Sequence, residues 1–391
     1  MSVSEKHAIL SPSSSHRWLK CTPSARLEET LPEKTSEYAA AGTLAHKIAE
    51  LKLKKYCIEP MSTRTFNSRL NKLKKQPLYE DEMMKRTDTY LDYVAGILHG
   101  FDAPPYAAVE KKIDYSTYAP EGFGTCDCLI IGGNIMHVID FKYGKGVPVS
   151  AEKNTQMMFY ALGAFTEYAF LYPIKSIIMT IVQPRQGGIS EYQMPSQELL
   201  NWGESIKPIA QKAFNGEGEF IAGAHCRFCK AAATCRTNKD TNMAVDVFGY
   251  KEPPLISNEE VGQILEKAQN LAKWVKRLEE YALSEVLKGN DIPGWKAVHG
   301  KSVRQFTDQD KAFEILKENG MDEIMLYERK PITLAAAEDL LGKSKFKELL
   351  DSYVNKSSGK PTLVPLNDKR EPIQKISAKD VFKNEGGIVN D

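Results

Sequence analysis

Apolar residues recur along this chain first with a helical period and then with a strand period, and the order of these periods predicts the fold. Near the N-terminus, Leu44, Ile48 and Leu51 are spaced as on one face of a helix, which predicts a helix over residues 36–56. A second helix is predicted over residues 79–98. The chain therefore opens with helices.

Continuous apolar runs follow, as is typical of strands buried in a sheet. We predict strands over residues 106–113, 124–131, 135–141, 176–183 and 189–194. Further helices are predicted over residues 151–170 and 195–214, before and after the last two strands. This order predicts an α/β fold.

The character of the chain changes after Pro253-Pro254. A long amphipathic helix is predicted over residues 257–288, with Ser257 as its N-cap and two acids in its first turn. From Asn355 onward Gly, Pro, Lys and Asp dominate, which predicts a flexible tail. We therefore expect three parts, namely a core over residues 1–240, an α-rich accessory domain over 255–354 and a tail over 355–391.

Composition adds little at the level of the whole chain. With 391 residues and 42% hydrophobic content, the chain can bury a full core, and its formal net charge is only +1. Locally, nine Lys and Arg residues stand against two acids between Lys47 and Lys75. This stretch is a candidate phosphate-facing surface, although a solvated helix face is the plainer interpretation.

The distribution of apolar residues also indicates the cellular compartment. No apolar run reaches the roughly 18 residues that a membrane span needs, and the N-terminus lacks the apolar core of a signal peptide. We expect a cytoplasmic protein that does not bind membranes. In a reducing compartment, the seven cysteines are expected to be buried thiols or metal ligands.

Two carboxylates lie on a predicted hairpin, in the stretch GTCDCLIIGGNIMHVIDFKYGKG. If Gly133 and Asn134 form the turn, Asp127 lies directly opposite Asp140, and if the turn is one residue earlier the two are diagonal on one face. Either register lets the carboxylates share one cation. Lys142 lies two residues after Asp140 and shares its face.

A solvated sheet face with a cross-strand ion pair is the plain interpretation of such a pattern. The flanking sequences CLII and IMHVI are too apolar for an exposed edge hairpin, which favours a buried site. Oxygen ligands of this kind suit Mg²⁺ or Mn²⁺ bound beside a substrate phosphate. Lys142 would then orient the attacking water and stabilise charge on phosphorus, so the sequence predicts phosphodiester hydrolysis.

Other residues have the right spacing to join this site. Gln156 and Tyr160 lie four residues apart on the helix that follows the hairpin, and His46 lies in the first long helix. Taken alone, each also fits an ordinary structural role. The cysteines flanking Asp127, Cys126 and Cys128, are expected to be core thiols that both point to the face opposite Asp127.

A cluster of cysteines follows the predicted core. Cys226, Cys229 and Cys235 have the spacing C-x2-C-x5-C, which is typical of a metal site but lacks the fourth ligand of a tetrahedral centre. Four cysteines, or three with His225 or His16, are alternatives for zinc.

The order of these motifs resembles that of the PD-(D/E)XK nuclease superfamily, in its RecB-like branch. The elements that carry the resemblance are the helical His46, Gly124-x-x-Asp127, Asp140-x-Lys142 and Gln156-x3-Tyr160, over roughly residues 11–236. The stretch SPSSSHRWLKCTPSARLEE is also similar to phage and prophage proteins that carry a domain of unknown function. The resemblance implies a restriction-endonuclease-like αβββαβ core with extra helices.

The resemblance also implies roles for the residues. His46, Asp127, Asp140 and the backbone carbonyl of Phe141 would bind Mg²⁺ or Mn²⁺, with Lys142 as the catalytic lysine. Gln156 and Tyr160 would support the site and contact the DNA backbone. Glu110 stands where the family often has an acid on the first strand.

Members of the AddB-like iron–sulfur branch bind a 4Fe–4S cluster through one cysteine before the nuclease core and three after it. The resemblance therefore implies that Cys21 joins Cys226, Cys229 and Cys235 as a clasp around the core. Structural Zn²⁺ is the alternative occupant. Linking segments about 200 residues apart would give the clasp a stabilising role.

The function expected from this resemblance is a Mg²⁺- or Mn²⁺-dependent DNA nuclease, an exonuclease by analogy with the branch, acting in phage or prophage recombination or repair within a bacterial host cell. Its partners would be single-stranded or end-bearing duplex DNA, with phage recombination or single-strand-binding proteins as further candidates. A non-catalytic DNA-binding or assembly module that keeps the nuclease fold is the alternative.

Overall fold

The computed structural model describes residues 8–32, 37–146, 148–186, 188–244, 257–298, 308–318, 321–322, 326–327, 333–350 and 353–354. By its internal contacts the chain divides into two compact units, Met1–Val298 and His299–Asp391. The tail that we predict over residues 355–391 lies outside the described residues. None of the helices in the described ranges combines the length and apolar character needed to cross a membrane.

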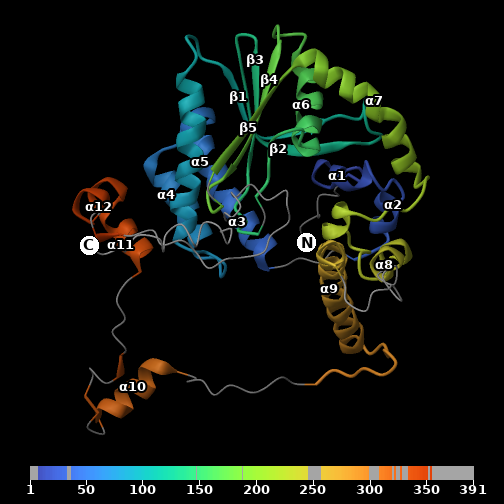
Figure 1. Cartoon of the computed structure of the whole chain (residues 1–391). Coiled ribbons are helices and arrows are strands. Elements are labelled where there is room, and N and C mark those ends of the chain that lie inside the picture. Colours follow the sequence, from blue (N-terminus) through green and yellow to red (C-terminus); the bar gives the residue numbers. More distant parts are fainter. Residues whose placement is uncertain are drawn as a thin grey trace, which may run out of the picture. The chain divides into compact units, whose positions relative to one another are not determined.

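One sheet of five strands forms the centre of the described part of the first unit (Figure 1). Its strands, in spatial order, are β1 (Tyr106–Asp114), β2 (Phe123–Gly132), β3 (Ile135–Phe141), β4 (Ser176–Gln183) and β5 (Gly188–Pro195). Neighbours are antiparallel except β3 and β4, which are parallel because the helix α6 (Thr155–Tyr168) connects them as a crossover. The predicted α/β character and all the predicted strands are confirmed.

Helices cover both faces of the sheet, and each face has its own core (Figure 1). The helices α3 (Glu37–Leu53) and α5 (Glu82–His99) pack on one face, where Ile48, Tyr90 and Phe141 are buried. The helices α6 and α7 (Ser196–Asn215) pack on the other, around Phe159 and Leu199. Apolar contact on both faces explains why the strand sequences are so uniformly apolar.

The helix boundaries follow local chemistry. Helix α6 begins at Thr155 rather than near residue 151, because the Asn154 side chain caps it by accepting hydrogen bonds from the backbone N–H groups of Gln156 and Met157. The first predicted helix ends in a π-helical turn, η2 (Lys54–Ile58). The polar helix α4 (Thr63–Lys74) was not predicted, because only Leu70 in it is buried.

The segments before and after the sheet lie side by side. The N-terminal elements are η1 (Pro12–Ser14), α1 (Ser15–Trp18) and α2 (Ser24–Glu29), and the later ones are η3 (Ala224–Phe228), α8 (Arg236–Met243) and α9 (Asn258–Leu287). Arg26 donates a hydrogen bond to the Phe214 carbonyl at 2.5 Å, and Arg277 of α9 donates to the Cys226 carbonyl at 3.0 Å. The ends of the first unit therefore meet at the cysteine-containing segment.

Helix α9 starts where the sequence predicts. The Ser257 side chain accepts from the backbone of Glu260, and the Glu260 side chain accepts from the backbone of Ser257, which forms a capping box. The second unit, described by itself, is helical and contains α10 (Gln309–Glu318), α11 (Leu334–Leu341) and α12 (Lys343–Leu350).

Candidate functional site

Three acidic residues form a row across neighbouring strands. In the β1–β2 ladder Val109 pairs with Cys128 and Lys111 pairs with Cys126, which places Glu110 opposite Asp127. The β2–β3 ladder ends at the pair Cys128–Ile139, and its register places Asp127 opposite Asp140. The hairpin thus uses the Gly133–Asn134 turn, one of the two registers that keep these carboxylates together.

Glu110 interrupts the regular pairing of β1. Its φ is 52°, in the left-handed region that residues with a side chain rarely adopt, and the ladder has no pair at this position. Backbone strain of this kind persists only where the surrounding structure enforces it, and it is concentrated at functional sites. At this distortion the Glu110 carboxylate lies beside Asp127.

His46, Glu110 and Asp127 form a compact group of ligand atoms. One atom from each residue lies within 4.8 Å of the other two. The His46 Nδ1 atom is 3.4 Å from Asp127 Oδ2, which also accepts a 2.7 Å hydrogen bond from the Phe141 backbone N–H. An imidazole and two carboxylates in such proximity are a suitable donor set for a divalent cation.

Asp140 lies beside this group but contacts a different set of residues. Its carboxylate is 3.0 Å from the Lys142 ammonium, and its Oδ1 accepts a 3.1 Å hydrogen bond from the Gln156 amide. The Gln156 amide also lies 3.4 Å from the Tyr160 hydroxyl. Asp140 Oδ2 is the atom that lies 3.0 Å from the Lys142 Nζ, and it is buried without a hydrogen bond from the described residues.

The structure therefore changes the predicted ligand set in one respect. It brings His46 and Asp127 together, as expected, but the third member of the tight group is Glu110 and not Asp140. The sequence placed Glu110 on the first strand, but the distorted backbone that sets its side chain beside Asp127 has no sequence signal other than the acid itself. Lys142, Gln156 and Tyr160 gather around Asp140 as their spacing predicts.

The charges in this site are strongly coupled. Burial favours the neutral form of Asp127, but His46, the Phe141 backbone N–H and Lys142 together outweigh burial and lower the pKa of Asp127. Burial raises the pKa of Asp140 despite the opposing effect of Lys142. Burial, with the Asp127 charge in addition, raises the pKa of Glu110 to about 7. The cluster holds three carboxyl groups against two groups that can carry positive charge, the His46 imidazole and the Lys142 ammonium.

Lys142 remains protonated in this environment. Burial alone would lower the pKa of its ammonium group, but the nearby charges of Asp140 and Asp127 outweigh burial and raise that pKa. The pKa of His46 is likewise raised, because Asp127 and Asp140 together outweigh the effect of burial. Lys142 therefore offers a fixed positive charge and hydrogen-bond donors, not a basic nitrogen.

The prediction for the two cysteines that flank Asp127 is half correct. Both thiols are buried, as expected for core residues. They do not share a face, however, because Cys126 packs with the core under α6 whereas Cys128 packs with the core under α3 and α5. The alternation from which a common face was predicted therefore does not hold between these two positions of β2.

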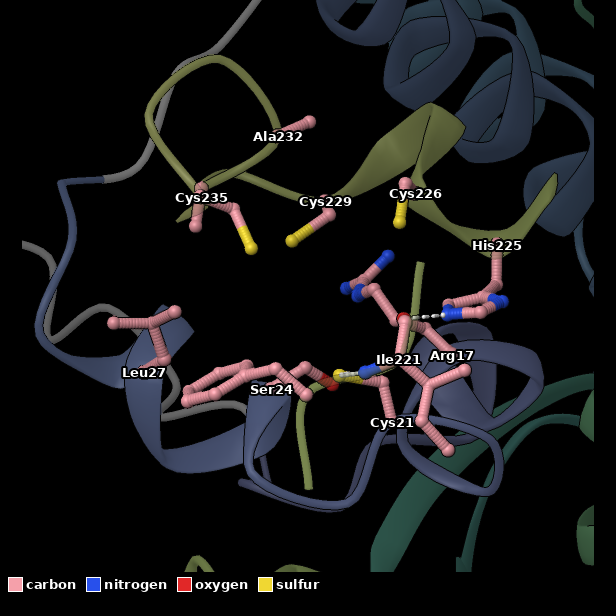
Figure 2. A pocket seen from close by; sticks show the side chains of 12 residues that line it. Arg17, Cys21, Ser24, Leu27, Ile221, His225, Cys226, Cys229, Ala232 and Cys235 are labelled. Atoms are coloured by element: carbon pink, nitrogen blue, oxygen red, sulfur yellow. Dashed lines mark hydrogen bonds between the residues drawn. The ribbon is translucent and has the colours of Figure 1, made fainter. Parts of the chain in front are cut away.

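The other four cysteines of interest line a single pocket (Figure 2). Cys21 comes from the N-terminal segment, and Cys226, Cys229 and Cys235 come from the loop after α7. In Figure 2 the thiols of the three later cysteines lie across the pocket from Cys21. The fold thus lines one pocket with cysteines from before and after the sheet.

A buried ion pair supports the cysteine pocket from one side. The Arg17 guanidinium lies 2.6 Å from the Glu28 carboxylate, and both side chains are only 9% exposed. Arg17 also donates to the Phe228 carbonyl at 3.1 Å, and Glu28 accepts from the Lys230 backbone N–H at 2.7 Å. This pair holds the N-terminal helices against the loop that carries Cys226 and Cys229.

His225 and His16, the alternative zinc ligands, have other partners. His225 lines the pocket, but its Nε2 atom lies 2.8 Å from the Ile221 carbonyl (Figure 2). The His16 ring is exposed and meets the Phe228 ring edge-on at 6.4 Å. Burial raises the pKa of Cys226, and it raises that of Cys229 to about 12, so both are protonated without a metal.

The basic stretch of residues 47–75 is largely engaged in structural contacts. Lys52 is buried and contacts Asp88 at 2.5 Å, and Lys54 contacts Glu50 at 2.7 Å. Lys55 lies over the Phe66 ring at 4.3 Å. These contacts favour the plainer interpretation of the stretch, a solvated and internally paired helix surface.

The molecule is thus a mixed α/β protein with a cluster of carboxylates and an imidazole on its sheet and a four-cysteine pocket where its ends meet. The chain belongs to the family described as "Protein of unknown function (DUF2800)", whose profile matches residues 7–371. Among solved structures, it is similar to one titled "Crystal structure of SSO0001", at 14% identity and a TM-score of 0.24, over 57% of this chain and 96% of that one. A TM-score of that size is too low to relate the two folds.

Proposed function

We propose that this protein is a Mg²⁺- or Mn²⁺-dependent deoxyribonuclease with a restriction-endonuclease-like core of the PD-(D/E)XK type. The observation that carries the proposal is the row Glu110, Asp127 and Asp140 across β1 to β3, with Lys142 paired to the last of these acids. A surface ion pair would not explain why one buried and two half-buried carboxylates gather beside one protonated lysine.

The residues divide into those that hold a cation and those that act on the phosphate. His46, Glu110 and Asp127 would hold the metal, with Asp140 Oδ2 and the Phe141 carbonyl as further oxygen donors. The bound metal supplies Lewis acidity toward a phosphodiester oxygen and lowers the pKa of its water.

Lys142 would act as a positioned cation. Its raised pKa keeps it charged at neutral pH, so it orients the attacking water and stabilises negative charge on the phosphoryl oxygens instead of removing a proton. Gln156 contacts both Asp140 and Lys142 and holds them in place, and Tyr160 supports Gln156. In the reaction the water oxygen bonds to phosphorus and one phosphodiester P–O bond breaks.

We further propose that Cys21, Cys226, Cys229 and Cys235 bind a 4Fe–4S cluster, with Zn²⁺ as the alternative. The convergence of four thiols from two distant segments of the chain on one pocket supports an occupant held by all four. The position of the pocket, between the N-terminal helices and the loop after α7, suits a structural clasp. Visible absorption and iron and sulfide analysis of anaerobically purified protein decide between the two, since a colourless protein with stoichiometric zinc contradicts the cluster.

The same resemblance suggests the biological setting. We propose an exonuclease that acts in the cytoplasm on phage or prophage DNA during recombination or repair. Membership of the DUF2800 family is compatible with the phage-like N-terminal stretch. Recombination proteins and single-strand-binding proteins of the same phage are the expected partners.

The test is digestion of labelled single-stranded and duplex DNA in Mn²⁺ by the wild type, Asp140→Ala and Lys142→Ala. We expect cleavage by the wild type only. Equal activity of all three would overturn the assignment. DNA binding without cleavage in either metal would favour the alternative, a non-catalytic DNA-binding or assembly module.

A further inference from the structure

A second pocket begins at the proposed catalytic residues and extends away from them. It is a groove of about 710 Å³, and Lys142 and Gln156 are among the residues that line it. Arg17 and Phe228, which belong to the walls of the cysteine pocket or its loop, line it as well. A ligand in the groove would therefore run from the carboxylate site toward the cysteine loop.

The lining of this groove carries positive charge without negative charge. Its lysine and arginine residues are Arg17, Lys20, Lys142 and Lys153, and it contains no Asp or Glu. Glu28 offsets Arg17 and Asp140 offsets Lys142. Lys20 and Lys153 are exposed and form no ion pair with a described residue, so two charges remain for a ligand. An anion fits this groove by charge complementarity.

Lys153 is also held in an unusual backbone conformation. Its φ is 47°, in the left-handed region, just before the Asn154 cap of α6. The backbone here is strained although it forms no part of the sheet or of the carboxylate row.

The groove also presents an aromatic surface. The Phe228 side chain is 62% exposed; its ring meets His16 edge-on, and the Arg227 guanidinium lies 5.5 Å from the ring centroid. Burial and the nearby Arg17 lower the pKa of His16, so its ring adds no charge at neutral pH. An exposed ring beside cations is the combination that holds unpaired bases, because the ring stacks on a base while the cations contact the phosphates.

We propose that this groove binds a single DNA strand that leads to or from the carboxylate site, with Lys20 and Lys153 contacting phosphates and Phe228 stacking on a base. This inference rests on the proposed function, because it names the substrate of the same site. The cysteine loop is then part of the substrate-binding surface as well as a clasp. Phe228, Lys20 and Lys153 are binding residues and not catalytic ones.

The experiment measures binding of fluorescein-labelled oligothymidine by fluorescence anisotropy at several salt concentrations. Every variant carries Asp140→Asn and no divalent cation is added, so that the strand stays intact. The groove variants are Lys20→Ala with Lys153→Ala, and separately Phe228→Ala. Their matched controls are Lys175→Ala, an exposed lysine at the start of β4, and Phe170→Ala, a 92% exposed ring beyond the C-terminal end of α6.

Each class of variant has its own expected signature. Loss of two phosphate contacts lowers the slope of log affinity against log salt by about 1.4, at about 0.7 for each contact on a single strand. Phe228→Ala lowers affinity on the order of 10-fold without changing that slope, because stacking releases no counterions. The two controls match the parent protein.

The outcomes separate this inference from the proposed nuclease activity. Groove variants that bind like their controls overturn the groove, even if the wild type cleaves DNA in Mn²⁺. If Phe228→Ala loses as much affinity for blunt duplex DNA as for oligothymidine, Phe228 does not stack on an unpaired base of a single strand. If the wild type cleaves nothing but the groove variants lose affinity as described, the groove stands and the nuclease assignment falls.

Discussion

The carboxylate site and the cysteine pocket differ in how the chain builds them. The carboxylates come from neighbouring strands, and the positions of Glu110, Asp127 and Asp140 follow from the register of the sheet. The cysteine pocket joins Cys21 to residues more than 200 positions later, so that its geometry depends on the fold of everything between them. The carboxylate site lies on neighbouring strands of one sheet, whereas the cysteine pocket lies where segments from before and after the sheet meet.

The two sites also have opposite effects on stability. At the carboxylate site burial opposes ionisation and the acids repel one another, which raises the pKa of both Asp140 and Glu110 and destabilises the folded state. The cysteine pocket lies among buried contacts, and any occupant would restrict the unfolded chain. Substitutions at the first site should therefore impair function, and those at the second should impair stability.

The largest expected effect is that of Cys21→Ser. If an occupant joins Cys21 to the later cysteines, removing this link releases a loop of about 200 residues and destabilises the protein by about 5 kcal/mol. Urea unfolding of anaerobically purified protein measures the change. Cys57→Ser is the control, because Cys57 is only partly buried and its thiol contacts the Leu53 carbonyl of its own helix. Equal stability of the two variants would mean that the pocket is no clasp.

The next effect tests the clasp without touching a cysteine. Glu28→Gln leaves the buried Arg17 guanidinium without a counter-charge and should destabilise the protein by about 3 kcal/mol. Glu29→Gln, at the neighbouring residue, removes an exposed partner of Arg26 and should change the stability by less than about 1 kcal/mol. Thermal unfolding of both variants measures the difference, and similar midpoints would show that the Arg17–Glu28 pair does not hold this end of the molecule.

How far the sequence predicts these features depends on how local their causes are. Strands β3 and β4 have the predicted bounds, since their apolar runs end at turn residues such as Gly133 and Asn134. The contact of Gln156 with Asp140 follows from helical and strand periodicity. Helix α4 was missed because an exposed polar helix leaves no apolar period.

Features that depend on irregular backbone could not be predicted in this way. The left-handed conformation of Glu110 breaks the alternation of β1, so its place in the ligand group does not follow from counting residues. The separation of Cys126 from Cys128 onto opposite faces does not follow from counting residues either. The groove beside Lys142 also depends on segments that only the tertiary structure brings together, among them Lys20 and Phe228.

At the carboxylate site, Asp140→Asn should separate activity from stability. Cleavage in Mn²⁺ should fall at least about 100-fold, equivalent to about 2.7 kcal/mol of transition-state stabilisation. The raised pKa of Asp140 means that folding disfavours its ionised form, so a neutral amide of the same size should not lower the unfolding midpoint. Activity assays and thermal unfolding of the same preparation test this. A variant that unfolds more easily than Cys21→Ser would remove the contrast between the two sites.

The smallest effect, Glu110→Gly, is the sharpest test of that contrast. Glycine adopts a φ of 52° without strain, and the substitution removes a half-buried carboxylate beside Asp127, so stability should increase by about 1 kcal/mol. Mn²⁺ binding, followed by calorimetry, should weaken because a ligand is lost.

The matched control is Glu121→Gly, at an exposed residue with the same φ of 52° that lies outside the ligand group. It should gain stability through relief of strain but bind Mn²⁺ like the wild type. If Glu110→Gly keeps full Mn²⁺ affinity, Glu110 is no ligand. If Glu110→Gly is less stable than the wild type, the glutamate side chain stabilises the strained backbone. The carboxylate site would then contribute to folding, a role that we assign to the cysteine pocket alone.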